Sequence, residues 1–101
     1  VRNHRGKRAH VTFEGRLDYE SFRLPDEDPS VLAAETAIRA VGETPERAVS
    51  NGGLDANWLT LRGLPTVTLG GGQMHVHTTA ERLDLREFDR ACQVALVLAG
   101  G

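Results

Sequence analysis

The stretch "NGGLDANWLTLRGLPTVTLGGG", residues 51–72, decides the fold predicted for this chain. Its first three residues predict a tight turn, and residues 54–62 predict a short helix. Gly63 and Pro65 end that helix, because glycine can take the left-handed position after a helix and proline cannot continue it. Residues 66–69, "TVTL", are rich in β-branched side chains and predict a short strand, after which three glycines open a loop.

Two longer helices are predicted on either side of this stretch. Residues 28–42, "DPSVLAAETAIRAVG", begin with Asp28 as a cap and Pro29 in the first turn. Residues 84–101 begin with Asp84, which forms a capping-box pattern with Glu87. Helical spacing predicts one buried stripe on each helix: Val31, Ala34, Ile38 and Val41 on the first, and Leu85, Phe88, Cys92, Leu96 and Ala99 on the second.

A further strand is predicted at residues 46–50, "ERAVS", directly before the turn. The order from residue 26 onward is then helix, strand, helix, strand, helix. Two strands joined through a helix by short loops form a right-handed parallel crossover. The sequence therefore predicts an α/β fold that contains a parallel β-α-β unit.

The N-terminal part has a different pattern. Residues 9–19, "AHVTFEGRLDY", alternate between apolar and polar side chains, which predicts a strand with one solvated face in an antiparallel sheet. A Pro- and Asp-rich connector follows, so we place a domain boundary near Pro25, between residues 1–25 and residues 26–101. Because the chain opens without an initiator Met, we expect it to be a fragment, a processed chain or a truncated form.

Composition limits the classes of partner. The 101 residues carry a net charge of −2, with 40% hydrophobic and 26% charged residues, which is ordinary for a soluble globular chain. We expect no nucleic-acid partner and no membrane partner, and "VALVLA" is too short to span a bilayer. The single cysteine, Cys92, excludes an internal disulfide; it fits a cytoplasmic location and a place in the core.

A binding site is predicted where the two parallel strands end. Ligands of parallel sheets bind at the carboxyl ends of the strands, and here these ends run into "SNGG" and "LGGG". The glycines can let a ligand approach the backbone, or they can simply form tight turns. His75 and His77 follow the second turn. In extended backbone their imidazoles would point the same way, about 6.5 Å apart, so they could share a metal ion or serve separate roles. Glu81 is placed to support an imidazole.

The ordered set "NGGLDANWLTLRGLPTVTLGGG…HVHTTAERLDLREFDRACQVALVLA" resembles the C-terminal end of the peptidase T-like dinuclear zinc peptidases. This wider family includes aminoacylase, carboxypeptidase G and succinyl-diaminopimelate desuccinylase. The resemblance runs from about Leu24 to the C-terminus. It implies a zinc-peptidase α/β domain with an inserted α+β lid: residues 1–25 look like the end of the lid, and residues 26–101 look like the last part of the catalytic domain.

The resemblance also implies roles for single residues. His77, in "HTTAE", matches the family's last metal ligand, with Glu81 as its support, whereas His75 matches no ligand. The turn region that lines the substrate pocket in the family corresponds to Asn51, Gly52, Gly53, Asp55 and Asn57. The family's other ligands to its two Zn²⁺ ions, and the Glu that acts as general base, lie upstream in family members. They cannot be identified in these residues, so the chain alone should not hydrolyse a substrate.

The resemblance predicts the C-terminal segment of a zinc-dependent hydrolase that cleaves amide bonds of small peptides or N-acyl amino acids. If the protein forms a homodimer, the lid or the exposed sheet edge is where the second copy would pair. The alternative is a non-enzymatic α/β module that binds a small anion or a protein partner. A third reading is a nucleotide-binding domain that uses the glycine turns, although neither a Rossmann fingerprint nor a P-loop is present.

Overall fold

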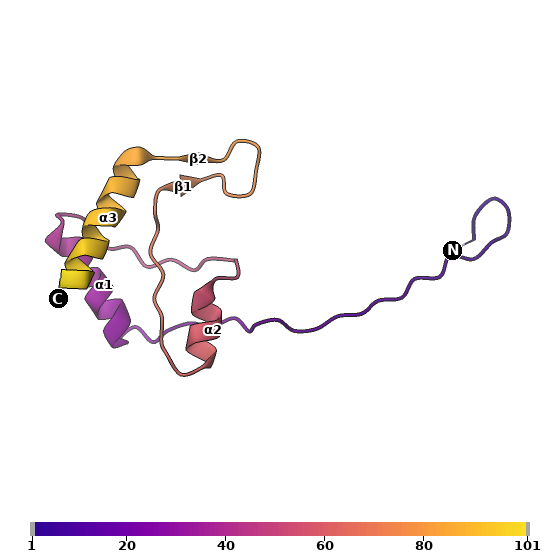
Figure 1. Cartoon of the computed structure of the whole chain (residues 1–101), viewed down its shortest axis with the longest axis horizontal. Helices are drawn as coiled ribbons and strands as arrows, with labels where there is room; N and C mark the ends of the chain where they lie inside the picture. Colours follow the sequence, from indigo (N-terminus) through magenta and orange to yellow (C-terminus); the bar gives the residue numbers. More distant parts are fainter. Residues whose placement is uncertain (1, 101) are drawn as a thin grey trace.

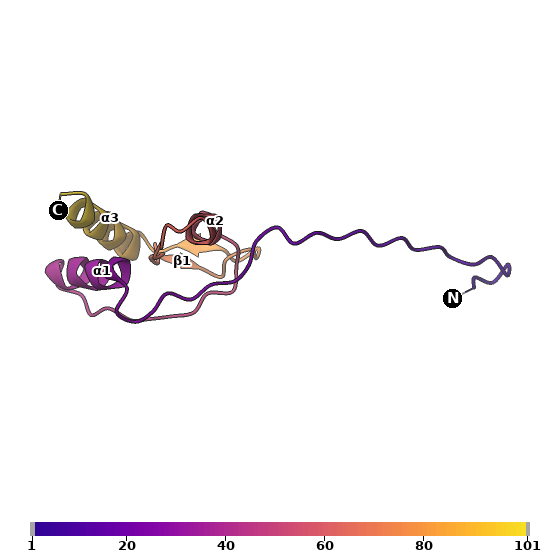
Figure 2. The ribbon, with the colours of Figure 1, turned by 90° about the horizontal axis from the view of Figure 1, so that it is seen from below.

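The computed structural model describes residues 2–100 as a small helical body with one long N-terminal arm, residues 2–20 (Figure 1). The elements follow the order α1 (Pro29–Ala40), α2 (Asp55–Leu61), β1 (Gln73–Met74), β2 (Arg82–Leu83) and α3 (Leu85–Gly100). The molecule measures 68 × 35 × 19 Å. Much of the longest dimension is the arm, which projects away from the body in both views (Figures 1 and 2).

Helix α1 forms as its sequence predicts. The Asp28 carboxylate accepts hydrogen bonds from the backbone N–H of Ser30 at 2.9 Å and from the Ser30 hydroxyl at 2.6 Å. These bonds stabilise the ionised carboxylate and lower the pKa of Asp28. Beyond the last turn, Gly42 takes a φ of 85° and lets the N–H of Glu43 return to the carbonyl of Ile38 at 3.1 Å. The capping residues read from the sequence therefore set both ends of the helix.

The core lies mainly between α1 and α3, which pack side by side. Ala34 and Ala37 of α1 and Val94 of α3 are buried, as is Ala56 of α2. Arg90 of α3 also forms an ion pair with Glu43. Small side chains dominate, and in the described part of the chain no side chain has less than 2% relative exposure. The apolar area removed from water is accordingly modest.

The predicted buried stripe of α3 is wrong for this structure. Leu85 and Leu96 are each 73% exposed, Phe88 is 46% exposed, and Cys92 is also exposed rather than a core thiol. The helix turns a different face, centred on Val94, toward α1. Helical spacing identifies an apolar face correctly, but a face becomes core only where another element covers it. On α1, by contrast, the predicted stripe is buried or half-buried.

Helix α2 confirms the prediction made from residues 54–62. Gly63, at a φ of 82°, ends it, and the N–H of Leu64 returns to the carbonyl of Leu59 at 3.0 Å. The helix contains only seven residues.

The strands differ from prediction. Among residues 2–100 the one sheet is a two-stranded antiparallel hairpin, in which Gln73 pairs with Leu83 and Met74 with Arg82; the sequence predicted a loop there. The predicted strands at residues 9–19, 46–50 and 66–69 are not formed, so the parallel β-α-β unit is absent from this structure. An extended segment becomes a strand only when a partner accepts its backbone hydrogen bonds. Mixed helix and strand is the part of the α/β prediction that holds.

Among residues 2–100, the alternating segment of the N-terminal arm likewise has no strand partner. Val11 is 84% exposed and Phe13 is 91% exposed, and the other side chains of residues 9–19 are exposed too, so neither face of the alternating segment is covered. The segment lacks the sheet that its pattern predicts, and the boundary placed near Pro25 remains a prediction. Of the helices in the described residues, none is both long and apolar enough to cross a bilayer.

Candidate functional site

The two histidines lie in the turn of residues 75–81, which joins β1 to β2. Both take left-handed backbone conformations, with φ of 54° at His75 and 65° at His77, which non-glycine residues rarely adopt. The expectation of an extended His-Val-His pair is therefore wrong. Sparsely populated conformations persist where surrounding bonds hold them, and they concentrate at functional sites.

Several hydrogen bonds hold this turn. The carbonyl of His75 accepts bonds from the N–H of Thr78 at 3.2 Å and from the Thr78 hydroxyl at 2.7 Å. The same hydroxyl accepts a bond from the N–H of Ala80, and the carbonyl of Thr78 accepts one from the N–H of Glu81. Thr78 thus holds the backbone of this turn through its hydroxyl and its peptide groups.

Glu81 supports His77 differently from the prediction. Its carboxylate accepts a short hydrogen bond, 2.7 Å, from the backbone N–H of His77. A charged acceptor makes this bond stronger than a neutral one. Glu81 therefore fixes the backbone from which the imidazole projects, rather than the imidazole ring itself, and both side chains remain exposed.

The base of the hairpin is fastened to the start of α3. The N–H of Asp84 donates to the carbonyl of Gly72 at 2.9 Å, and the Asp84 carboxylate caps α3 by accepting from the N–H groups of Arg86 and Glu87. Gly72 has a φ of 83°, and a Cβ there would lie 2.8 Å from the carbonyl oxygen of Asp84. The predicted cap is confirmed, and only glycine fits at position 72 without strain.

These residues do not make a metal site by themselves. A hydrolytic zinc site needs about three protein ligands and an open position for water. Residues 2–100 contain no group of three or more His, Cys, Asp or Glu side chains that could hold an ion. His77 is available as a single ligand on a fixed turn, and the side chains present do not suffice for a zinc ion.

The second candidate element is the turn before α2. Asn51, Gly52, Gly53 and Asp55 are exposed there, whereas Asn57 is only 7% exposed. The Asn57 amide oxygen accepts a hydrogen bond from the N–H of Leu54 at 3.0 Å, and its amide nitrogen donates to the carbonyl of Glu20 at 2.9 Å. The Asn57 side chain, predicted to meet substrate, is thus engaged within the protein.

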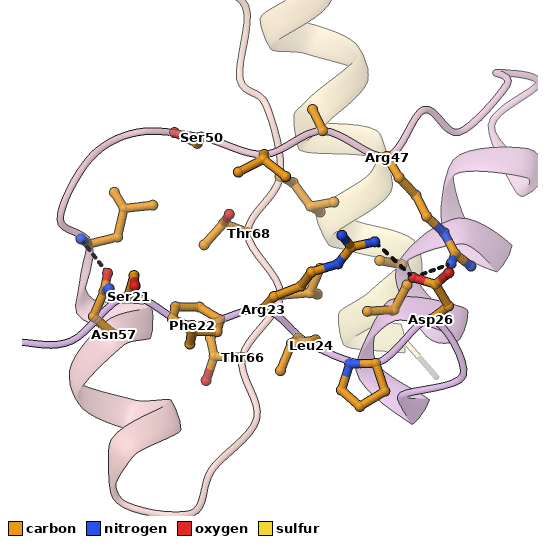
Figure 3. Close-up of a pocket in the computed structure, with 18 of the residues that line it drawn as sticks. Ser21, Phe22, Arg23, Leu24, Asp26, Arg47, Ser50, Asn57, Thr66 and Thr68 are labelled. Carbon is orange, nitrogen blue, oxygen red and sulfur yellow. Dashed lines mark hydrogen bonds and ion pairs between the residues drawn. The ribbon is translucent and has the colours of Figure 1, made fainter.

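An open cavity of about 600 Å³ adjoins this turn. Three extended segments, residues 21–26, 45–52 and 66–69, line it together with α1, and Figure 3 shows their side chains around the opening. Three of the predicted site residues line this cavity: Asn51, Gly52 and Asn57. The lining is largely apolar in its central part and charged at the end near Asp26.

The charged end is an ion-pair network centred on Arg47. Its guanidinium lies 2.6 Å from the Glu35 carboxylate and 3.1 Å from the Asp26 carboxylate, and Arg23 approaches Asp26 at 3.6 Å. The hydrogen bond from Arg47 lowers the pKa of Glu35, and the same bond raises the pKa of Arg47. The network ties the connector before α1 to residues 45–52, as the dashed lines in Figure 3 indicate in part.

The structure brings the two candidate elements to the same end of the body. The turn between β1 and β2 and the turn before α2 both lie at the end from which the arm departs (Figures 1 and 2). The cavity involves only the second turn. Sequence reasoning missed the Arg47 network and the contact of Asn57 with Glu20. Asn57, three residues after the start of the predicted helix at residue 54, was the available signal for the Leu54 bond, whereas no local pattern indicates a partner 37 positions away.

Comparison with known proteins places this geometry in context. Residues 7–99 match the family described as Peptidase family M20/M25/M40. The chain is similar to the crystal structure of aminopeptidase PepT from Bacillus cereus, with a TM-score of 0.73 and 34% identity over 79% of this chain and 21% of that one.

Two curated relatives agree with this likeness. The chain is 38% identical to a [LysW]-lysine hydrolase of Deinococcus radiodurans, over 88% of this chain and 25% of that protein. It is 32% identical to the uncharacterized protein YqjE of Bacillus subtilis, over 92% of this chain and 24% of that protein. The chain spans about a quarter of the length of these relatives. With the family match extending over nearly all of its residues, the chain belongs to peptidase family M20/M25/M40.

Proposed function

We propose that this chain is the C-terminal segment of a hydrolase that cleaves amide bonds of small peptides or N-acyl amino acids. The observation that carries the proposal is the joint likeness in sequence and fold to an aminopeptidase, 34% identity with a TM-score of 0.73. The name of the [LysW]-lysine hydrolase adds a second hydrolase among the relatives. Identity above 30% over most of this chain argues for shared chemistry as well as shared architecture.

In this proposal His77 supplies one ligand to a Zn²⁺ ion, and the turn of Asn51, Gly52 and Gly53, with Asp55, lines the substrate pocket. The fixed turn around His77 supports the first role, because a preorganised backbone limits the directions of the imidazole. The remaining ligands must come from other polypeptide, since residues 2–100 offer no complete set. Members of this family are generally metal-dependent; no catalytic step is assigned to residues of this chain.

The test compares His77→Ala with His75→Ala in a full-length enzyme that carries this segment. Both histidines are exposed and left-handed, two residues apart in one turn, so the two variants remove the same side chain at similar backbone cost. We expect His77→Ala to lose activity by about 100-fold or more, together with roughly one equivalent of zinc. His75→Ala should keep both. Equal losses in the two variants, or none in either, would overturn the assignment of His77.

A free-standing binding module is the alternative, and the packing favours it less. The buried apolar residues of the described chain are three alanines and one valine, a small core for an independent domain. Sedimentation and a thermal melt of this chain separate the readings: a module should be monomeric with a sharp transition, whereas a segment of a larger domain should self-associate or melt broadly. Within the hydrolase proposal we expect a cytoplasmic enzyme; if it forms a homodimer, two copies would pair through the lid domain or the exposed sheet edge.

A further inference from the structure

We propose that Asn57 is a positioning residue that ties the base of the N-terminal arm to the turn at residues 51–54. It rests on the proposed function in one respect, the assignment of that turn to the substrate pocket. Asn57 is almost fully buried, and its amide makes one bond in each direction. The oxygen holds the N–H of Leu54, within the turn, and the nitrogen holds the carbonyl of Glu20, where the arm meets the body.

A steric contact also links the arm to the turn. The Tyr19 ring lies against the backbone of Gly53, so closely that a Cβ added at Gly53 would overlap the phenol oxygen and the ring. Tyr19 also packs edge-on against Trp58, with ring centroids 6.5 Å apart and planes at 66°. Arm residues 19 and 20 therefore contact the turn and the first half of α2 through both packing and hydrogen bonding. Figure 3 shows Asn57 beside the residues that follow the arm.

This arrangement separates two variants of Asn57. Asn57→Asp keeps an oxygen that can accept from the N–H of Leu54 but has no donor for the Glu20 carbonyl. Asn57→Ala removes both bonds. If Asn57 joins two elements, Asn57→Asp should release the arm and leave the turn intact, whereas Asn57→Ala should disturb both. Asn51→Asp, at an exposed position of the same turn, adds the same charge and serves as the matched control for these structural readouts.

Two measurements on a full-length enzyme that carries this segment, with any cysteines outside it replaced by serine, report the contacts of Asn57 with the arm and with the turn. Cys92 is exposed in this structure and accepts one spin label; a second label at Asp18→Cys gives the distance from α3 to the base of the arm. Amide hydrogen exchange at Leu54 reports the turn. We expect Asn57→Asp to broaden the distance distribution while Leu54 exchanges within about twofold of wild type, because its acceptor remains. Asn57→Ala should broaden the distribution and speed Leu54 exchange by roughly fivefold to tenfold, as loss of one buried bond predicts.

Gly53→Ala provides an independent check, because it displaces Tyr19 without touching either bond of Asn57. It should also broaden the distance distribution, and adding Tyr19→Ala should bring no further change. A distribution that is unchanged in Asn57→Asp, or already broad in wild type, would overturn the proposal. So would a distribution that is unchanged in Asn57→Ala while Leu54 exchange accelerates, since Asn57 would then serve the local fold alone.

The functional consequence is measured in a full-length enzyme that carries this segment. Asn57→Asp should raise KM for an amide substrate by several-fold, with kcat less affected and zinc content unchanged, because the turn keeps its own shape but is no longer held to the arm, while the metal ligands are intact. A parallel fall in zinc content would contradict a positioning role. If wild-type enzyme lacks amide hydrolysis altogether, the proposed function fails, and the spin-label and exchange results still decide the coupling.

Discussion

Replacing Gly72 by Ala tests how the hairpin is fastened to α3. At a φ of 83° an alanine costs about 1–2 kcal/mol in left-handed strain. Its methyl group would also lie 2.8 Å from the carbonyl oxygen of Asp84 and 3.0 Å from both the Cβ of Glu87 and the backbone nitrogen of Phe88. Crowding of this kind adds about 1–3 kcal/mol, so Gly72→Ala should destabilise the chain by about 2–5 kcal/mol.

Gly63→Ala is the matched control for this prediction. Gly63 has nearly the same φ, 82°, but a Cβ there meets nothing within 4 Å. It should therefore show the conformational cost alone, about 1–2 kcal/mol. The difference between the two variants isolates the contact with Asp84, Glu87 and Phe88.

Thermal denaturation followed by far-UV circular dichroism measures both variants under one protocol. Each kcal/mol should lower the Tm by about 4–8 °C in a chain of this size. The reasoning is refuted if Gly72→Ala is no more destabilising than Gly63→Ala. That result would mean that the hairpin base moves freely against α3.

Three further outcomes follow from the described geometry. Glu81→Gln should weaken the charge-assisted bond to the backbone of His77 and speed exchange of that amide by several-fold, whereas a bond to the ring would leave the amide unaffected. Arg47 lowers the pKa of Glu35, so their pairing stabilises the fold above the unfolded pKa of 4.5, and this stabilisation is lost as the pH falls through the lower folded pKa. Glu35→Gln should remove this part of the acid sensitivity, as thermal melts at a series of pH values would measure. Cys92 should react with a thiol reagent in the folded chain at nearly the rate seen in denaturant, and strong protection would contradict its exposed position.

Local signals predicted the helices well. Asp28, Gly42, Gly63 and Asp84 act within one or two turns of their own position, so the physics that fixes them is present in a short window of sequence. The boundaries of α1 and α2 followed from them. The family resemblance, read from an ordered set of such signals, was also confirmed.

The strands and the site geometry depend on partners that a short window does not contain. Residues 46–50 and 66–69 have strand-like composition, yet they become strands only if a neighbour accepts their backbone bonds. The stripe of α3 from Leu85 to Ala99 has apolar side chains at helical spacing, which is why it was predicted to be buried. It stays exposed because nothing in the described chain covers it. The left-handed turn at His75 and His77 arises from bonds to Thr78 and Glu81 that periodicity alone does not reveal.

The fastening of the hairpin to α3 has a mechanical consequence. Through Gly72 and Asp84, the hairpin that carries the His77 turn is bound to the start of α3, which in turn packs against α1. The turn at residues 51–54 is instead bound to the base of the arm. The two candidate elements are thus held by different contacts, one by the start of α3 and the other by the base of the arm. A substitution that weakens one set of contacts leaves the bonds within the other turn in place.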